Sequence, residues 1–151
     1  MNTGAFDPLR EIAEITRANG AWLHVDGAFG LWARASEGRR ALADGMELAD
    51  SWATDAHKWL NVPYDCGVAI VRHAEDHRAA MTSTAAYLIQ TGGAERDAVD
   101  WCPEFSRRAR GIPVHAALRA LGRDGVEALV DRCCAHARQF ADLLGAEAGV
   151  R

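Results

Sequence analysis

A lysine and an aspartate stand out for the chemistry that their positions allow. Lys58 lies in the stretch Asp50-Ser-Trp-Ala-Thr-Asp-Ala-His-Lys-Trp-Leu60, just beyond a short apolar run, and Asp26 directly follows another, Ala21–Val25. The separation is enough for one strand–connection–strand unit of an α/β sheet. A lysine amine forms Schiff bases with carbonyl compounds, and a carboxylate holds a pyridine nitrogen protonated. The pair therefore predicts an enzyme that uses pyridoxal phosphate (PLP).

Each of these residues also has an ordinary structural interpretation. A lysine after a strand is usually a solvated surface group, although Trp59-Leu60 gives Lys58 an apolar setting that favours the neutral, nucleophilic amine. An aspartate at a strand end is as often a turn cap as a ligand. His57, next to the lysine, fits a strand-end histidine bonded to the backbone as well as a site residue.

Short apolar runs predict the strands that position this pair. Ala21–Val25 is expected to be a strand buried on both faces, so Asp26 falls at its carboxyl end, where ligands of α/β sheets bind. Ser51–Thr54 and Cys66–Val71 predict two further strands, with residues 55–58 leaving the first of them as a loop. The fold class is therefore α/β.

Helical patterns flank these strands. Asp7-Pro8 predicts the start of a helix, with Asp7 as the capping residue, and Asn19-Gly20 predicts its end. A short helix is expected around Arg39–Ala43. After Arg72 the pattern is helical and polar, and residues 90–100 have the composition of a loop. Two helices, over residues 112–121 and 124–144, are expected to meet at a bend marked by Gly122 and Gly125.

Composition excludes several classes of protein. The 151 residues are 49% hydrophobic and 25% charged, which is ordinary for a globular chain, and the net charge of −4 gives no reason to expect nucleic acid or an anionic membrane as partner. No apolar run approaches the ~20 residues that span a bilayer. Four cysteines without C-x-x-C spacing predict reduced thiols and no metal site. We expect a cytoplasmic protein.

Several segments together resemble a known family. They are Asn2–Pro8, His24–Asp26, Ala49–Ser51, His57–Leu60 and Asp65–Gly67, followed by a second block, Pro103–Gly111 and Ala117–Gly122. These segments are similar to the group II PLP-dependent decarboxylases, which include the aromatic-L-amino-acid and glutamate decarboxylases. The resemblance spans almost all of the chain, although a typical member of that family is much longer.

The resemblance implies a fold and a set of roles. The fold would be a portion of the large domain of the fold type I PLP enzymes, a mainly parallel sheet flanked by helices with a long C-terminal helix. Residues 1–72 would form the cofactor-lysine region and residues 73–151 a loop and helical segment. Lys58 would form the Schiff base with PLP, Asp26 would contact the pyridine nitrogen, and Ala28 would pack beneath the ring. His57 would lie near the cofactor phosphate and the site entrance.

The resemblance also implies partners, and it leaves alternatives open. An amino acid would be the substrate and the enzyme would be a homodimer, to which the apolar face of the helix over 124–144 also points. No segment resembles the family's phosphate-binding loop or the side chain that stacks over PLP, and the loop over 90–100 lacks the tyrosine of many relatives. The chain would therefore support decarboxylation of an L-amino acid, serve as a non-catalytic module without PLP, or catalyse an aminotransferase or aldolase-type reaction.

A few further residues are candidates for the site. The basic cluster Arg107, Arg108 and Arg110 would contact an anion, either a substrate carboxylate or a structural acidic partner, or would simply be solvated. His24 shares a strand face with Asp26 and is as well suited to core packing as to the site. By resemblance, Asn2 and Thr3 would reach the cofactor ring oxygen.

Overall fold

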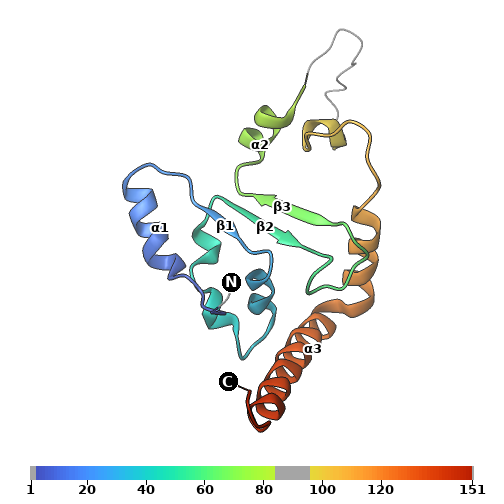
Figure 1. Cartoon of the computed structure of the whole chain (residues 1–151). Coiled ribbons are helices and arrows are strands. Elements are labelled where there is room, and N and C mark those ends of the chain that lie inside the picture. Colours follow the sequence, from blue (N-terminus) through green and yellow to red (C-terminus); the bar gives the residue numbers. More distant parts are fainter. Residues whose placement is uncertain (1–2, 84–95, 151) are drawn as a thin grey trace.

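A three-stranded sheet forms the centre of the molecule (Figure 1). The computed structural model describes residues 3–83 and 96–150, in which β1 (His24–Asp26), β2 (Ser51–Asp55) and β3 (Gly67–Val71) lie in that order. β1 pairs with β2 in parallel, whereas β2 and β3, which residues 56–66 connect, are antiparallel. The predicted α/β class and the second and third strands are confirmed, whereas the first strand is shorter than predicted and lies at His24–Asp26 instead of Ala21–Val25. The parallel character holds for the β1–β2 pair.

Helices surround the sheet. They are α1 (Leu9–Ala18), α2 (Ala74–Met81), α3 (Gly111–Gly145) and the 3-10 helices η1 (Gly30–Ala35), η2 (Arg40–Ala43), η3 (Met46–Leu48) and η4 (Ala98–Asp100). The prediction that Asp7 caps α1 is wrong. Pro8 occupies the capping position with a ψ of 73°, and no side chain caps the helix. At the other end, the Asn19 side chain donates to the Ile15 carbonyl, which closes α1 where the sequence predicts.

The long helix α3 bends at Gly122, as the sequence predicts. Gly122 has φ 62° and ψ −173°, a conformation that breaks the helical path and that side-chain-bearing residues rarely adopt. Val126 and Val130, just beyond the bend, are buried. The bend therefore lets the first half of α3 and the start of its second half both pack on the body of the molecule.

Two apolar clusters hold these elements together. The first, which we call the turn core, consists of Ala56, Leu60, Val62 and Cys66 from the β2–β3 connection together with Val126 of α3. The second joins α1 to the sheet and contains Ala13, Leu23 and Ala49. The prediction that the first strand is buried on both faces is wrong, because β1 is an edge strand of the described sheet, with His24 and Asp26 exposed.

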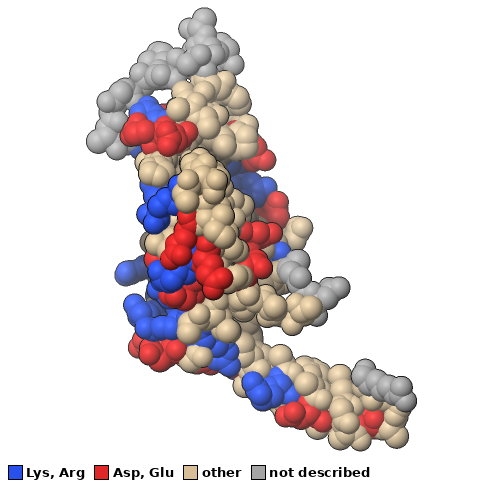
Figure 2. All heavy atoms as spheres, turned by 90° about the vertical axis from the view of Figure 1, so that its left-hand side faces the viewer, with Lys and Arg blue, Asp and Glu red and all other residues tan. Residues whose placement is uncertain are grey.

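Beyond the turn core, α3 continues as an arm that projects from the body (Figure 2). Its apolar side chains Phe140, Leu143 and Leu144 are all more than half exposed. Within the described ranges, no helix is both long enough and apolar enough to cross a membrane. The predicted loop over residues 90–100 and the candidate Asn2 fall partly or wholly outside the described residues.

Candidate active site

The carboxyl ends of β1 and β2 lie side by side and bring the two predicted site segments together. Asp26 is the last residue of β1 and pairs in register with Ala53 of β2. The next residue, Gly27, donates its backbone N–H to the Ala53 carbonyl at 2.8 Å. The turn that carries Lys58 begins directly after β2 ends at Asp55. Both segments therefore leave the sheet at the same edge, where α/β proteins place their ligands.

Gly27 is required for this close approach. A Cβ atom at this position would lie 2.9 Å from the Leu31 Cβ and 3.1 Å from the Ala53 carbonyl oxygen. The first of these distances is shorter than any normal carbon–carbon contact. The glycine between Asp26 and Ala28 is thus what allows the turn after β1 to pack against β2.

Asp26 combines a capping role with an available oxygen. Its Oδ1 accepts a hydrogen bond from the Ala28 backbone N–H at 3.1 Å, the turn cap that the sequence offers as one of two interpretations. No hydrogen bond to Oδ2 is formed by any residue in the ranges 3–83 and 96–150, and the residue is exposed. The cap fixes the carboxylate while leaving one oxygen for another partner.

Lys58 lies against a carboxylate and an aromatic ring. Its Nζ is 2.6 Å from Oδ2 of Asp55 and 4.1 Å from the centroid of the Phe29 ring. The apolar setting expected from Trp59-Leu60 is therefore incomplete, because the Lys58 amine lies against a carboxylate. The hydrogen bond from Lys58, and then its charge, hold the pKa of the Asp55 carboxyl below its ordinary value.

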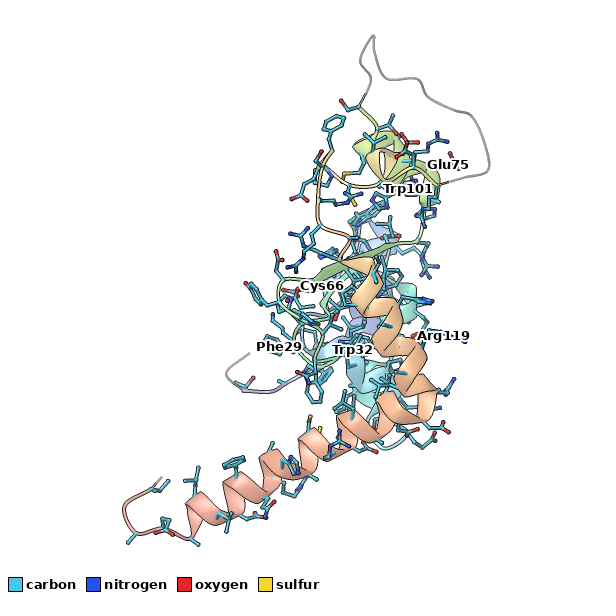
Figure 3. The ribbon with its side chains drawn as sticks, turned by 90° about the vertical axis from the view of Figure 1, so that its right-hand side faces the viewer. Phe29, Trp32, Cys66, Glu75, Trp101 and Arg119 are labelled. Atoms are coloured by element: carbon cyan, nitrogen blue, oxygen red, sulfur yellow. The ribbon has the colours of Figure 1, made fainter. Side chains whose placement is uncertain are left out.

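Phe29 joins the two halves of the site. It belongs to the turn that follows Asp26, and its ring lies beneath the amine of Lys58. Figure 3 labels Phe29 and Cys66, which lie on the same side of the molecule. Sequence reasoning missed both Phe29 and Asp55. The i,i+3 spacing of Asp55 and Lys58 was the available signal for the ion pair.

Lys58 is also the only lysine in the sequence, since the other sixteen basic residues are arginines. The turn core fixes its position, with Ala56 and Leu60 buried on either side of it. Lys58 itself keeps 30% of its side chain exposed. The buried residues of the turn core thus hold the turn in place, while the amine of Lys58 remains partly accessible.

His57 is held by the backbone of the β2–β3 connection. The N–H of Cys66 donates to His57 Nδ1 at 2.9 Å, and the ring meets Tyr64 edge-on with centroids 4.5 Å apart. This is the structural interpretation that the sequence offers for His57. His24 has a comparable structural role, because its Nδ1 lies 2.8 Å from Oγ of Ser51.

The basic cluster contacts a structural acidic partner. Arg108 and Arg110 both bind the Asp65 carboxylate, each at 3.1 Å. Hydrogen bonding and charge from Arg110 hold the pKa of Asp65 below its ordinary value. Arg107 instead donates to the carbonyls of Glu104 and Ala98. Of the alternatives offered by the sequence, the acidic partner is the one found for Arg108 and Arg110.

A cavity of about 640 Å³ adjoins the turn after β1. Asp26, Ala28, Phe29 and Trp59 line it, and Val130 of α3 lies on a further wall. Ala28 is half-buried there. Of the predicted cofactor contacts, Asp26 and Ala28 line this cavity, which is large enough for a small organic ligand, whereas His57 and Lys58 do not line it.

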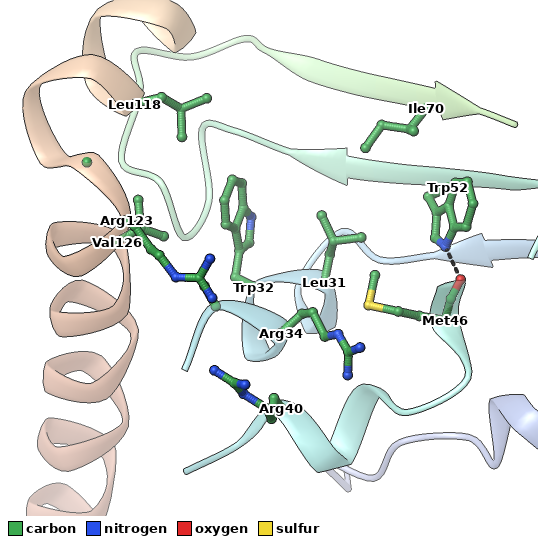
Figure 4. Close-up of a pocket in the computed structure, with 12 residues that line it drawn as sticks. Leu31, Trp32, Arg34, Arg40, Met46, Trp52, Ile70, Leu118, Arg123 and Val126 are labelled. Atoms are coloured by element: carbon green, nitrogen blue, oxygen red, sulfur yellow. Dashed lines mark hydrogen bonds between the residues drawn. The ribbon is translucent and has the colours of Figure 1, made fainter. Parts of the chain in front are cut away.

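A second cavity, of about 780 Å³, lies between the sheet and α3 (Figure 4). Its lining includes Trp32, Trp52 and Leu118, and the Trp52 Nε1 donates to the Met46 carbonyl at 2.7 Å. None of the predicted site residues lines this cavity. The larger of these two cavities is therefore not the one that adjoins Asp26 and Ala28.

Lys58 and Asp26 thus lie at the carboxyl edge of an α/β sheet, and the chain shares its fold with solved fold type I PLP enzymes. The model of the "Pyridoxal-dependent decarboxylase conserved domain" matches residues 1–149, and the chain belongs to this family. The described residues fit PLP at two points: a primary amine for its aldehyde and an available carboxylate oxygen for its ring nitrogen.

Individual relatives agree with this assignment. The chain is 39% identical to L-2,4-diaminobutyrate decarboxylase of Rhizobium meliloti over 130 residues, which are 84% of this chain and 26% of that protein. It is 34% identical to aspartate 1-decarboxylase of Aliivibrio fischeri, over 94% of this chain and 25% of the relative. The structure of Oryza sativa TDC with PLP and tryptamine matches with a TM-score of 0.84 at 28% identity, covering 94% of this chain and 30% of that one. The chain thus spans about a quarter to a third of the length of these relatives.

Proposed function

We propose that this chain carries the lysine-bearing part of a PLP-dependent amino-acid decarboxylase and binds the cofactor through Lys58. The observation that carries the proposal is the placement of Lys58 and Asp26 at one sheet edge, linked by Phe29, in a member of this family. When bound, PLP supplies an electron-poor ring that accepts the electron pair left when carbon dioxide departs.

Each site residue has a distinct task in this proposal. Asp26 offers its available oxygen to the pyridine nitrogen and keeps that nitrogen protonated, a charge-assisted bond that contributes about 1.5–3 kcal/mol. Lys58 supplies the amine that binds the aldehyde carbon of the cofactor, and the Asp55 carboxylate, 2.6 Å away, orients that amine. Ala28 leaves room beneath the ring, and His57 contributes an imidazole to the phosphate side.

The wider assignments belong to the same proposal. An amino acid is the substrate, and the relatives named above differ in the amino acid or amine that their names carry, so the likeness favours no particular one. A homodimer is supported by the apolar arm of α3. A cytoplasmic location is supported by four cysteines that form no disulfide.

An absorbance titration of the purified chain with PLP tests the proposal. The wild type should develop the visible band of lysine-bound PLP. Lys58→Ala should not, and neither should Lys58→Arg, which keeps the positive charge beside Asp55 without a primary amine. Asp26→Asn should weaken binding. A wild type without the band, or a band that persists in Lys58→Arg, would contradict the proposal and favour a non-catalytic module.

A further inference from the structure

Two arginines hold the connection between β2 and β3 from outside. Arg110 donates through Nε to the Asp65 backbone carbonyl at 3.1 Å and through Nη2 to its carboxylate, also at 3.1 Å. Arg108 adds bonds to the Tyr64 carbonyl at 2.9 Å and to the Asp65 carboxylate. Bidentate arginine–carboxylate contacts fix geometry as well as charge. The arginines that precede α3 therefore determine where residues 64 and 65 lie.

The next residue in the chain transmits this constraint to His57. Cys66 is buried, and its backbone N–H donates to Nδ1 of His57 at 2.9 Å. Its Sγ lies 3.6 Å from the Arg110 carbonyl, so Arg110 contacts both Asp65 and Cys66. A displacement of this connection would move the Cys66 N–H, whose hydrogen bond the His57 imidazole accepts.

This contact selects one tautomer of the imidazole. Nδ1 of His57 is also 3.0 Å from the Cys66 carbonyl, but that oxygen keeps a partner in the Ala56 N–H at 2.9 Å whichever tautomer the ring adopts. In the described part of the chain, the Cys66 N–H forms its hydrogen bond with Nδ1. If Nδ1 carried the proton, this buried N–H would lose its acceptor, which is unfavourable. This difference favours the neutral ring that carries its proton on Nε2.

We propose that Arg110 is a positioning residue for His57: acting through Asp65 and Cys66, it holds Nδ1 as an acceptor and so makes Nε2 an N–H donor. An N–H donor suits an anionic partner, and a cofactor phosphate is such a partner. The tautomer stands independently of the proposed function, whereas its use toward PLP rests on that proposal.

Long-range proton–nitrogen NMR spectra of the imidazole rings test the inference, recorded above the ordinary histidine pKa. His57→Gln assigns the His57 signals among the six histidines. Arg110→Gln is the test variant. Arg107→Gln is the matched control, because Arg107 belongs to the same basic segment but bonds only to the Glu104 and Ala98 carbonyls.

Wild type and Arg107→Gln should show the Nε2–H form of His57, and Arg110→Gln should show a mixture with the Nδ1–H form. An Nδ1–H ring in the wild type, or an unchanged ring in Arg110→Gln, would overturn the inference. If Arg110→Gln does not fold, Asp65→Asn removes the same carboxylate and must give the same mixture.

A second readout separates this inference from the proposed function. Arg110→Gln should weaken PLP binding about tenfold relative to Arg107→Gln if the Nε2–H donates to the cofactor. Wild type that fails to bind PLP would contradict the proposed function and leave the tautomer result intact. Equal PLP affinity of the two variants would overturn the use of the donor toward PLP.

Discussion

The β2–β3 connection and the arm of α3 differ in the exposure of their apolar side chains, which are buried in the connection and exposed in the arm. In the connection, Leu60 and Cys66 are each 3% exposed, and they surround the turn that presents Lys58. In the arm, Phe140 is 66% exposed and Leu143 is 60% exposed. The chain thus packs the turn that carries Lys58 with its own residues, whereas the arm offers apolar surface that no described residue covers. We therefore expect the packing around Lys58 not to depend on the arm of α3.

The largest expected effect comes from emptying the turn core. Leu60→Ala should lower the free energy of unfolding by about 2–5 kcal/mol, because it deletes a buried side chain and leaves a cavity. The same change in the arm, Leu143→Ala, should alter it by less than about 0.5 kcal/mol. Urea denaturation of both variants measures the contrast. Equal effects would show that the arm is packed in solution.

A smaller loss of stability is expected from a substitution in the turn after β1. Gly27→Ala places a Cβ 2.9 Å from the Leu31 Cβ and 3.1 Å from the Ala53 carbonyl oxygen, and should cost about 1–3 kcal/mol. Gly38→Ala is the control, since its Cβ would have no neighbour within 4 Å. Thermal unfolding of the two variants should separate them clearly. A Gly27→Ala variant as stable as Gly38→Ala would mean that the two strand ends are not in close contact.

Replacing the glycine at the bend in α3 should lower the free energy of unfolding by about 1–2 kcal/mol. Gly122→Ala forces a side chain into a left-handed φ of 62°, although there is space around it. Gly111→Ala, also with open space but without a left-handed φ, should leave stability unchanged or raise it. Denaturant unfolding of this pair isolates backbone strain from crowding. A stabilised Gly122→Ala would indicate that α3 is straight.

The exposed ion pairs should contribute least, and their contribution should disappear in acid. The folded-state pKa of Asp65 is lowered, first by its hydrogen bond from Arg110, so its stabilisation is complete above the ordinary aspartate pKa of about 3.9 and is lost as the pH falls through the folded value. The stability difference between wild type and Asp65→Asn should therefore be constant near neutral pH and shrink in acid. A difference that grows in acid would contradict the ion pair.

Strands and helix bends, which depend on the pattern of a few neighbouring residues, were largely predictable from the sequence. The three strands follow from short apolar runs, and the bend follows from Gly122, because both are decided within a few residues. The placement of Lys58 and Asp26 at one edge follows from parallel pairing of the strands that precede them. Asp7 failed as a cap because Pro8 takes a ψ that turns the chain before the helix begins.

Contacts between distant segments could not be predicted in the same way. Arg110 and Asp65 are 45 residues apart, and their pairing depends on how α3 docks on the turn core. Phe29 meets Lys58 only because the turn after Asp26 curls toward the β2–β3 connection. The basic cluster was recognisable as an anion contact, but its partner required the packed structure.

Borohydride trapping is the most direct test of whether PLP binds to the amine of Lys58. Borohydride reduces the bond between a lysine amine and the carbonyl carbon of PLP to a stable secondary amine, which peptide mass mapping then locates. Lys58 is the only lysine in the chain, so the label has one side-chain amine to occupy. We expect reduced PLP on the peptide that contains Lys58, and none there in Lys58→Arg. Wild-type protein that carries no label on Lys58 would contradict this expectation.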